Sequence, residues 1–572
     1  MEKSAEAPKG AGANFIVFVI LALFIIFTRY LSSVPTPHSW DAVQYVLAVE
    51  NYDVINHQPH PPGAPLLILL MRAVSLFTSS PHLALVYLNI AMSVVTLLMT
   101  LIVVKRMFGS ERAIMTAAIL ASSQTFAFYG STSNAYISEG FAGVAIALFC
   151  WLSLSRRTWY YAILSAILLA ASGAFRQFIV VTMFPLWLFA NSYLRKKPLL
   201  LTIVIVLFIC TIAVWFIPTV GTTGSYKEYS EASNLLYSAI MQQHSFFGQF
   251  PYDSTLHNLR QLFIYLFFSF NIFIAPFFLL PFCFFSSVAQ TTDASQGFGY
   301  WWSKQPQTLK FLVIWTVPPL CFYCLLHIPK PGYLMTVLPA LATLLVFMYE
   351  VISNWLERHW SIGRNRAKIT LLLLTIAVNG LCFLLLPQHI NEIFYGDNLY
   401  QFTRNAIKSR HQSFQMLRKH IISKFPKDET AIFIYKRGGR LRLFRELSLL
   451  LREYPVFEVN SMGDSIGFKE EKAIHNSFGT YEGRLLLELS KDFKEFMDAD
   501  KKKSVKISIG DAIGITAMRP DFPAEMKTLP LSGRSQVIVI TPARRTGKIA
   551  IVGAKRVYSE IVGPFRLKVA MR

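Results

Sequence analysis

Long apolar stretches recur through the first two thirds of the chain and decide what it can fold into. A helix needs roughly 18 to 20 mostly apolar residues to cross the hydrocarbon core of a bilayer. Hydropathy predicts about eleven such segments in a chain of 572 residues, of which 53% are hydrophobic. The sequence therefore predicts an α-helical polytopic membrane protein. The predicted segments are 14–31, 82–104, 113–129, 136–153, 159–171, 175–192, 199–218, 259–285, 309–326, 334–352 and 369–387.

The basic residues between these segments predict an orientation. The formal net charge is +22, and most Lys and Arg of the short loops fall on one side of the membrane if the N-terminus is cytoplasmic. This is the bias that the positive-inside rule describes, so the charge sets topology and we predict no nucleic-acid partner. An odd number of crossings then places the C-terminus outside the cytoplasm. The predicted location is the inner (plasma) membrane, as a multi-pass protein.

The predicted domains divide near residue 390. Residues 1–390 form the transmembrane domain, with long outer loops at 32–81 and 220–258; within the first, 65–77 is apolar but too short to span and is predicted to lie along the interface. Residues 391–572 alternate helices and strands, which predicts a small extracytoplasmic α/β domain. Its predicted elements are helices at 400–425, 440–453 and 482–498 and strands at 431–435, 456–459, 505–509, 536–541 and 549–552.

Few charged side chains lie near the outer ends of the predicted spans, and the predicted topology puts all of them on one side. A charge at membrane depth is costly and is usually retained for function. Their shared side therefore predicts a site at the outer face of the membrane. The candidates are Asp41, Glu139, Arg176 and Lys330, with His57 and His60 nearby.

Asp41 follows Trp40 in the first outer loop. A carboxylate in this place can act as a general base on a hydroxyl group. Equally, Ser39 or Asp41 can cap the helix that the sequence AVQYVLAVE predicts. The residues alone leave these two interpretations evenly balanced.

Glu139 stands at the start of the fourth predicted span. The helix macrodipole favours an acid at this end of a helix, which is the slightly favoured interpretation. The functional interpretation is a second acid facing Asp41. It would either orient the acceptor or, together with Asp41, bind a divalent metal ion such as Mg or Mn.

Arg176 and Lys330 are basic residues on the side where the charge rule predicts few. Each can extend to lipid headgroups, or each can bind a phosphate at the membrane surface. We favour phosphate binding, because both lie in short junctions that contain Pro or Gly. His57 and His60 can bind metal or phosphate, although a histidine in a Pro-rich loop is more often solvated or capping.

The run HPPG, which starts at His60, follows Asp41 and leads into an apolar helix. In this order the sequence resembles membrane glycosyltransferases of the GT-C class. The resembling branch includes protein O-mannosyltransferases, lipid A aminoarabinose transferases and uncharacterised bacterial relatives. The segment IPKPGYLMTVLPALATL resembles a late-span motif of this class, here Lys330, Tyr333 and the L-P pair at 338–339. LFRELSLLLREYPVFEV resembles the outer domain of some bacterial relatives.

The resemblance implies a polyprenyl-phosphate-linked sugar as donor and a hydroxyl of a lipid, glycan or protein as acceptor. It implies that Asp41 deprotonates this hydroxyl for direct displacement at the anomeric carbon, with inversion. Arg176, Lys330 and His60 would bind the donor phosphate, and His57 and Tyr333 would contact substrate; membrane lipids are the remaining partners. The loop has a single Asp where the mannosyltransferases have an Asp-Glu pair, which counts against protein mannosylation.

A transporter or flippase of a lipid-linked sugar is the alternative function. It too would need polar groups at membrane depth. Two features count against it: the candidate groups gather on one side, and no pair of interrupted half-helices lies near mid-membrane. A scaffold whose outer domain binds a partner is a third possibility, which no specific residue supports.

Overall fold

The computed structural model describes the helical part of the chain nearly completely and the C-terminal part mainly at its strands. His57 falls outside the described residues. The described residues are 11–278 without 56 and 57, 305–386 without 328, 402–436, 444–454, 456–460, 467–469, 486–488, 504–509, 513–518, 526–529, 535–542, 549–552, 554–563 and 565–571.

Within the described residues, eight helices are long and apolar enough to cross a membrane, and the predicted fold class is confirmed. Three shorter apolar helices, α3 (Pro65–Ser75), α8 (Trp159–Ser172) and α9 (Gln177–Ala190), lie among them. The eight are α1 (Ala11–Ser32), α4 (Pro81–Phe108), α7 (Tyr136–Arg156), α10 (Pro198–Gly221), α12 (Pro251–Phe270), α15 (Gln307–Leu325), α16 (Leu338–Trp360) and α17 (Arg364–Leu385).

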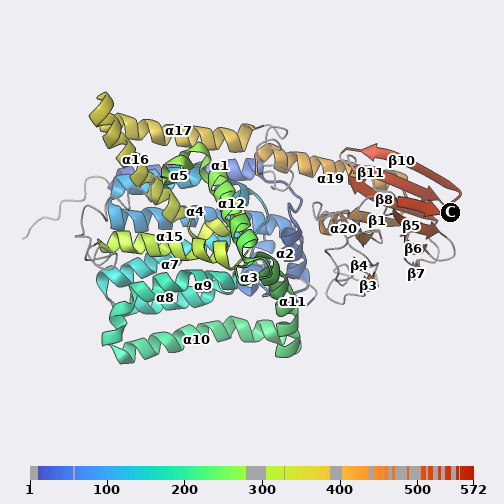
Figure 1. Ribbon diagram of the computed structural model, residues 1–572, viewed down its shortest axis with the longest axis horizontal. Coiled ribbons are helices and arrows are strands. Elements are labelled where there is room, and N and C mark those ends of the chain that lie inside the picture. Colours follow the sequence, from blue (N-terminus) through green and yellow to red (C-terminus); the bar gives the residue numbers. More distant parts are fainter. Residues whose placement is uncertain are drawn as a thin grey trace, which may run out of the picture. The chain divides into compact units, whose positions relative to one another are not determined.

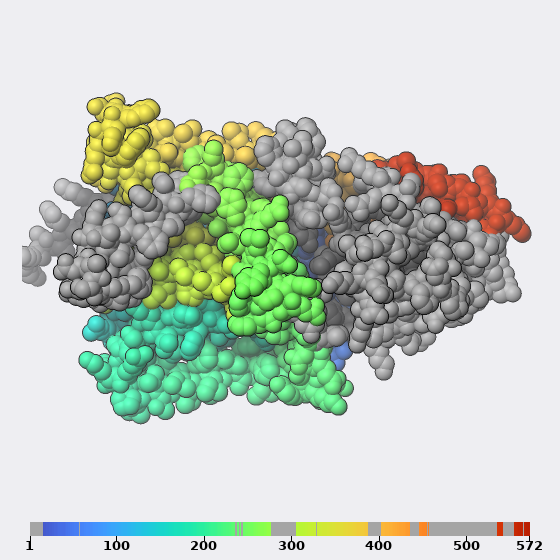
Figure 2. Space-filling view, viewed as in Figure 1, coloured from blue at the N-terminus to red at the C-terminus, as the bar shows by residue number. Residues whose placement is uncertain are grey.

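The helices α7, α8 and α10 pack side by side (Figure 1). α10 forms an edge of the helical unit, along the lower side of Figures 1 and 2. Only 6% of its most apolar 18-residue stretch is buried. Side chains such as Val206 and Ile209 are exposed along it. A helix that is this apolar and this exposed is stable in lipid and not in water.

Two predicted spans differ from the structure. Residues 113–129 are not one helix: α5 (Ser110–Ser122) ends at Ser123 and α6 (Gln124–Ser131) follows. Buried Arg29 of α1 donates from Nη2 to the carbonyl oxygen of Ala121 at 2.7 Å, so a cation occupies the negative end of α5. The predicted span at 259–285 instead begins as α12 at Pro251; α12 ends at Phe270, and η2 (Asn271–Phe278) continues as a 3-10 helix. Residues 279–285 of this span lie outside the described residues.

The predicted outer loop at 220–258 holds a helix, α11 (Tyr226–His244), which Ser225 caps by accepting from the amide of Glu228. The short helix η3 (Pro331–Thr336) lies against α7. A Cβ on Gly143 of α7 would lie 2.8 Å from the carbonyl oxygen of Thr336. Glycine therefore permits the close approach that brings η3 to the first turns of α7.

The C-terminal part contains a five-stranded sheet in the order β10-β11-β8-β1-β2. β1 (Thr430–Lys436) pairs in parallel with β2 (Val456–Asn460) and β8 (Gln536–Pro542), and β11 (Phe565–Met571) runs antiparallel to β8 and β10 (Arg556–Val562). α19 (Arg404–Lys424) and α20 (Phe444–Leu450) supply core residues such as Leu417 and Leu447. The remaining described strands are β3 (Gly467–Lys469), β4 (Leu486–Glu488), β5 (Ser504–Ile509), β6 (Ile513–Met518), β7 (Met526–Leu529) and β9 (Ile549–Val552).

The predicted strands at 431–435, 456–459, 505–509, 536–541 and 549–552 are all present. The predicted helix at 482–498 is wrong at Leu486–Glu488, which pair with β3 as strand β4; the rest of it lies outside the described residues. Strands β10 and β11 are additional to the prediction. Their place in the sheet depends on β8, which is distant along the sequence from β1.

By internal contacts the chain forms two compact units. The helical unit comprises Met1–Ser33, Pro61–Phe394 and Gln401–Ala406. The second unit comprises Val34–His60, Tyr395–Tyr400 and Ile407–Arg572. The segment that carries Asp41, including helix α2 (Trp40–Glu50), therefore belongs by contacts with the C-terminal part of the chain.

Candidate active site

Glu139 lies in the first turn of α7 and its side chain is only 1% exposed. Its Oε1 accepts a hydrogen bond from Nη1 of Arg176 at 2.9 Å. Its Oε2 is buried without a hydrogen-bond partner. A buried carboxylate oxygen that lacks a partner is costly and is usually retained where the group has a function.

Arg176 is the N-cap residue of α9, in extended conformation after the turn that ends α8. Besides the Glu139 bond, its Nη2 donates to the Tyr333 hydroxyl at 2.8 Å. The guanidinium also lies over the Tyr333 ring, 4.4 Å from its centroid, and 5.3 Å from that of Tyr136. One carboxylate and two aromatic rings thus hold a single cation in one orientation.

Lys330 is the N-cap residue of η3, and its Nζ lies 6.0 Å from the Tyr333 ring centroid. The Tyr333 ring stacks on Tyr323 at 4.9 Å. Gly332, between Lys330 and Tyr333, sits so close to α7 that a Cβ on it would lie 2.1 Å from Cγ of Tyr136. The structure therefore brings two cations, one carboxylate and a group of tyrosines together in the helical unit.

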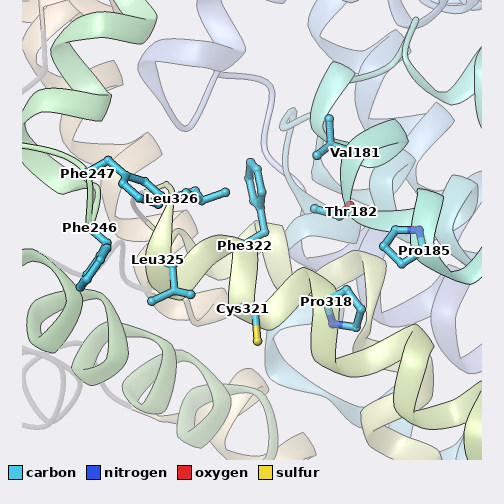
Figure 3. Close-up of a pocket in the computed structure, with 10 residues that line it drawn as sticks. All are labelled: Val181, Thr182, Pro185, Phe246, Phe247, Pro318, Cys321, Phe322, Leu325 and Leu326. Atoms are coloured by element: carbon cyan, nitrogen blue, oxygen red, sulfur yellow. The ribbon is translucent and has the colours of Figure 1, made fainter. Parts of the chain in front are cut away.

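A cavity of about 610 Å³ lies between α9 and α15 and is lined almost entirely by apolar side chains. Figure 3 shows Phe322 projecting between Leu326 on one side and Val181 on the other. The Phe322 ring stacks on His327 at 6.2 Å, and His327 contacts Tyr333 at 5.4 Å. An aromatic path therefore connects the cavity wall to Arg176. The lining residues are Val181, Thr182, Pro185, Phe246, Phe247, Pro318, Cys321, Phe322, Leu325 and Leu326.

Asp41 and His60 belong to the second unit. Ser39 is the N-cap of α2 and accepts from the amide of Ala42 at 3.1 Å, so Asp41 is not the cap. Asp41 stands in the first turn of the helix. Nδ1 of His60 lies 2.6 Å from Oε1 of Gln44 on α2, which fixes this histidine against the helix.

The described residues do not assemble a metal site. No three His, Cys, Asp or Glu side chains come together in the part of the chain that the structure describes. The ion-pair partner of Glu139 is a cation, Arg176. Glu139 as arranged therefore fits an ion pair with Arg176 better than it fits a divalent ion.

Of the predicted site residues, Glu139, Arg176, Lys330 and Tyr333 come together. Sequence reasoning missed Tyr136, Tyr323, His327 and the cavity. The position of His327, three residues before Lys330 in HIPK, was the available signal. Tyr136 could have been suspected because it precedes Glu139 by one helical turn.

No protein-family model matches the sequence, and a comparison with curated proteins found no match. Among solved structures, the chain is similar to ArnT from Cupriavidus metallidurans bound to undecaprenyl phosphate: TM-score 0.51, 10% identity, 98% of each chain covered. The apo state of that protein gives 0.48 at 11% identity over 78% of this chain and 86% of that one. The Archaeoglobus fulgidus oligosaccharyltransferase gives 0.41 at 14% identity over 79% and 65%. The first of these similarities confirms the predicted GT-C-like fold.

Proposed function

We propose that this multi-pass membrane protein is a glycosyltransferase that moves a sugar from a polyprenyl-phosphate donor to an acceptor hydroxyl, with inversion. One observation carries the proposal: the cations Arg176 and Lys330 gather around Tyr333, and the rings of Tyr333, His327 and Phe322 lead from there to an apolar cavity. A polyprenyl phosphate joins an anion to a long apolar tail, and this pair of features matches both parts of it. The chain shares its fold with ArnT, whose solved structure holds undecaprenyl phosphate.

The donor phosphate is bound by Arg176 and Lys330. Glu139 and Tyr333 orient the Arg176 guanidinium at 2.9 and 2.8 Å, so the cation is in place before the donor arrives. Preorganised charge of this kind stabilises the negative charge that develops on a leaving phosphate. The isoprenoid tail then occupies the cavity lined by Phe322, Val181 and their neighbours.

Asp41 is the general base. Its carboxylate takes the proton of the acceptor hydroxyl as the hydroxyl oxygen attacks the anomeric carbon. The bond from that carbon to the phosphate oxygen breaks, and polyprenyl phosphate leaves with the electron pair. Attack opposite the leaving group inverts the anomeric configuration, so a single carboxylate suffices, unlike the pair required for glycoside hydrolysis.

The remaining assignments complete the proposal. His60 contributes to phosphate binding, and His57 and Tyr333 contact substrate. The reaction takes place at the outer face of the inner (plasma) membrane, and the C-terminal domain is extracytoplasmic. The acceptor is a lipid, glycan or protein.

The test is sugar transfer by the full-length protein in lipid nanodiscs, supplied with radiolabelled polyprenyl-phosphate sugars and envelope acceptors. Arg176→Ala and Lys330→Ala should each raise the donor KM by about tenfold or more, as expected from losing a charged hydrogen bond. Arg176→Lys should recover only part, because an ammonium does not reproduce the guanidinium geometry. Arg260→Ala, at an exposed arginine of α12, is the matched control.

Two results would overturn the proposal. One is wild-type donor kinetics in both alanine variants. The other is movement of the lipid-linked sugar across a vesicle membrane without covalent transfer to any acceptor, which would identify a flippase.

A further inference from the structure

The segment Val34–His60, which carries Asp41, is fastened to the C-terminal domain at two places within the second unit. Thr36 Oγ1 lies 3.0 Å from Nδ1 of His411 on α19. Helix α2 packs against α20. The segment is thus held by both α19 and α20, the helices that supply core residues beside the five-stranded sheet.

An ion pair with a buried carboxylate joins these two helices. Nη2 of Arg410, on α19, donates to Oε1 of Glu446, on α20, at 2.9 Å, and the Glu446 side chain is 2% exposed. Glu446 Oε2 is buried without a hydrogen-bond partner. Arg410 is also held over the Phe414 ring, 5.2 Å from its centroid.

Asp41 lies within electrostatic range of this pair. Burial raises the pKa of Glu446, Arg410 opposes the rise, and the negative charge of Asp41 adds to it. Two carboxylates and one arginine therefore share a neighbourhood that is assembled from three elements.

We propose that Arg410 and Glu446 are positioning residues for Asp41, and that the C-terminal domain is part of the catalytic apparatus. The pair locks α19 to α20, and α20 supports α2, in whose first turn Asp41 stands. The domain thereby fixes the base against the incoming hydroxyl. This inference rests on the proposed function, because it gives Asp41 the role of base.

The pair should act on turnover and not on donor binding. The residues proposed to bind the donor phosphate, Arg176 and Lys330, are in the helical unit, whereas Arg410 and Glu446 are in the second unit. A base displaced by about 1 Å can lose roughly 10²-fold in rate. By the same principle, Arg410→Met and Glu446→Ala should lower kcat by about tenfold to a hundredfold with the donor KM unchanged, and Arg410→Lys should recover part of kcat.

A matched control exists in the same domain. Glu560 of β10 pairs with His420 and Lys424 of α19 at 2.7 and 2.8 Å, without involving the Val34–His60 segment. Glu560→Gln weakens the ion pairs between β10 and α19, which are more exposed than the Arg410–Glu446 pair, and should leave kcat unchanged. Comparison with this variant separates loss of positioning from general weakening of the domain.

The experiment measures two quantities on full-length protein in nanodiscs: transfer kinetics with a radiolabelled donor that the wild type uses, and hydrogen–deuterium exchange of the α2 amides. Arg410→Met and Glu446→Ala should raise exchange in α2, and Glu560→Gln should not. Folded variants that match Glu560→Gln in both kcat and α2 exchange would overturn the inference. If the wild type transfers no sugar, the proposed function fails instead, and the exchange result still decides whether the pair holds α2.

Discussion

Gly332 offers a graded test of how the candidate site is built. A Cβ at this position would lie 2.1 Å from Cγ of Tyr136, whereas ordinary contacts begin at 3.4 Å. Gly332→Ala therefore requires a shift of about 1.3 Å, the difference between these distances, in η3 or in the tyrosine. Tyr136 is 5% exposed and packs against Tyr129 at 4.7 Å, so it has little freedom to move away.

A shift of either η3 or Tyr136 disturbs the Arg176 guanidinium. Tyr136 lies under the Arg176 guanidinium, while η3 begins directly after Lys330 and carries Tyr333. A misplacement of about 1 Å can cost roughly 10²-fold in rate. We expect Gly332→Ala to lower kcat/KM by about that factor. The overpacking should also destabilise the protein by about 1–3 kcal/mol.

The contact surface between η3 and α7 offers two milder glycine-to-alanine variants. Alanine at Gly143 would meet the Thr336 carbonyl oxygen at 2.8 Å, and alanine at Gly140 would meet that of Met335 at 3.3 Å. Gly380, in α17, has no atom within 4 Å of the position that a Cβ would take, and it is the matched control. The expected order of damage is Gly332, then Gly143, then Gly140, with Gly380→Ala neutral or slightly stabilising.

Thermal unfolding in nanodiscs and sugar-transfer kinetics measure the two predicted effects. Unfolding temperature reports the packing of η3 on α7 whatever the reaction is, and kcat/KM reports its consequence for the site. A Gly332→Ala protein with wild-type values of both would refute the reasoning. So would a series in which Gly140→Ala is more damaging than Gly332→Ala.

Three further predictions concern single residues and the orientation of the chain. Asp41→Asn should lower turnover by about 10²- to 10⁴-fold. The unfolding temperature should stay near the wild-type value, because Ser39 and not Asp41 caps α2. Near-normal turnover would remove Asp41 as the base and make Glu139 the next candidate. Tyr333→Phe keeps the ring but removes the 2.8 Å hydrogen bond that Arg176 donates to the hydroxyl. A hydrogen bond to a charged group contributes about 1.5–3 kcal/mol, so its loss should lower kcat/KM roughly 10- to 100-fold. An unchanged kcat/KM would show that the carboxylate of Glu139 orients Arg176 alone. A reporter active only outside the cytoplasm should function when fused after Arg572, and activity of a cytoplasm-only reporter there would contradict the predicted topology.

Some features of this protein follow from residues that act locally. Whether a segment is apolar enough for lipid depends on its own composition, so most described residues of the eleven predicted segments lie in apolar helices, although 113–129 is broken at Ser123. The helix start at Ser39 and the strand at Thr430–Lys436 follow from capping chemistry and β-branched residues in the same way. The candidate site residues Glu139, Arg176 and Lys330 could be proposed because a charge near a span is unusual wherever it falls.

Other features depend on which surfaces meet, and local sequence does not encode that. The break between α5 and α6 is stabilised by Arg29, which comes from α1, 92 residues away. Arg176 finds its carboxylate 37 residues before it and its tyrosine 157 residues after it. Asp41 shares its unit with Arg410 and Glu446 because α2 packs on α20. Hydropathy decides that helices enter the membrane, but only the interlocking of their side chains, with Gly143 and Gly332 at the closest approach, decides which charges become neighbours.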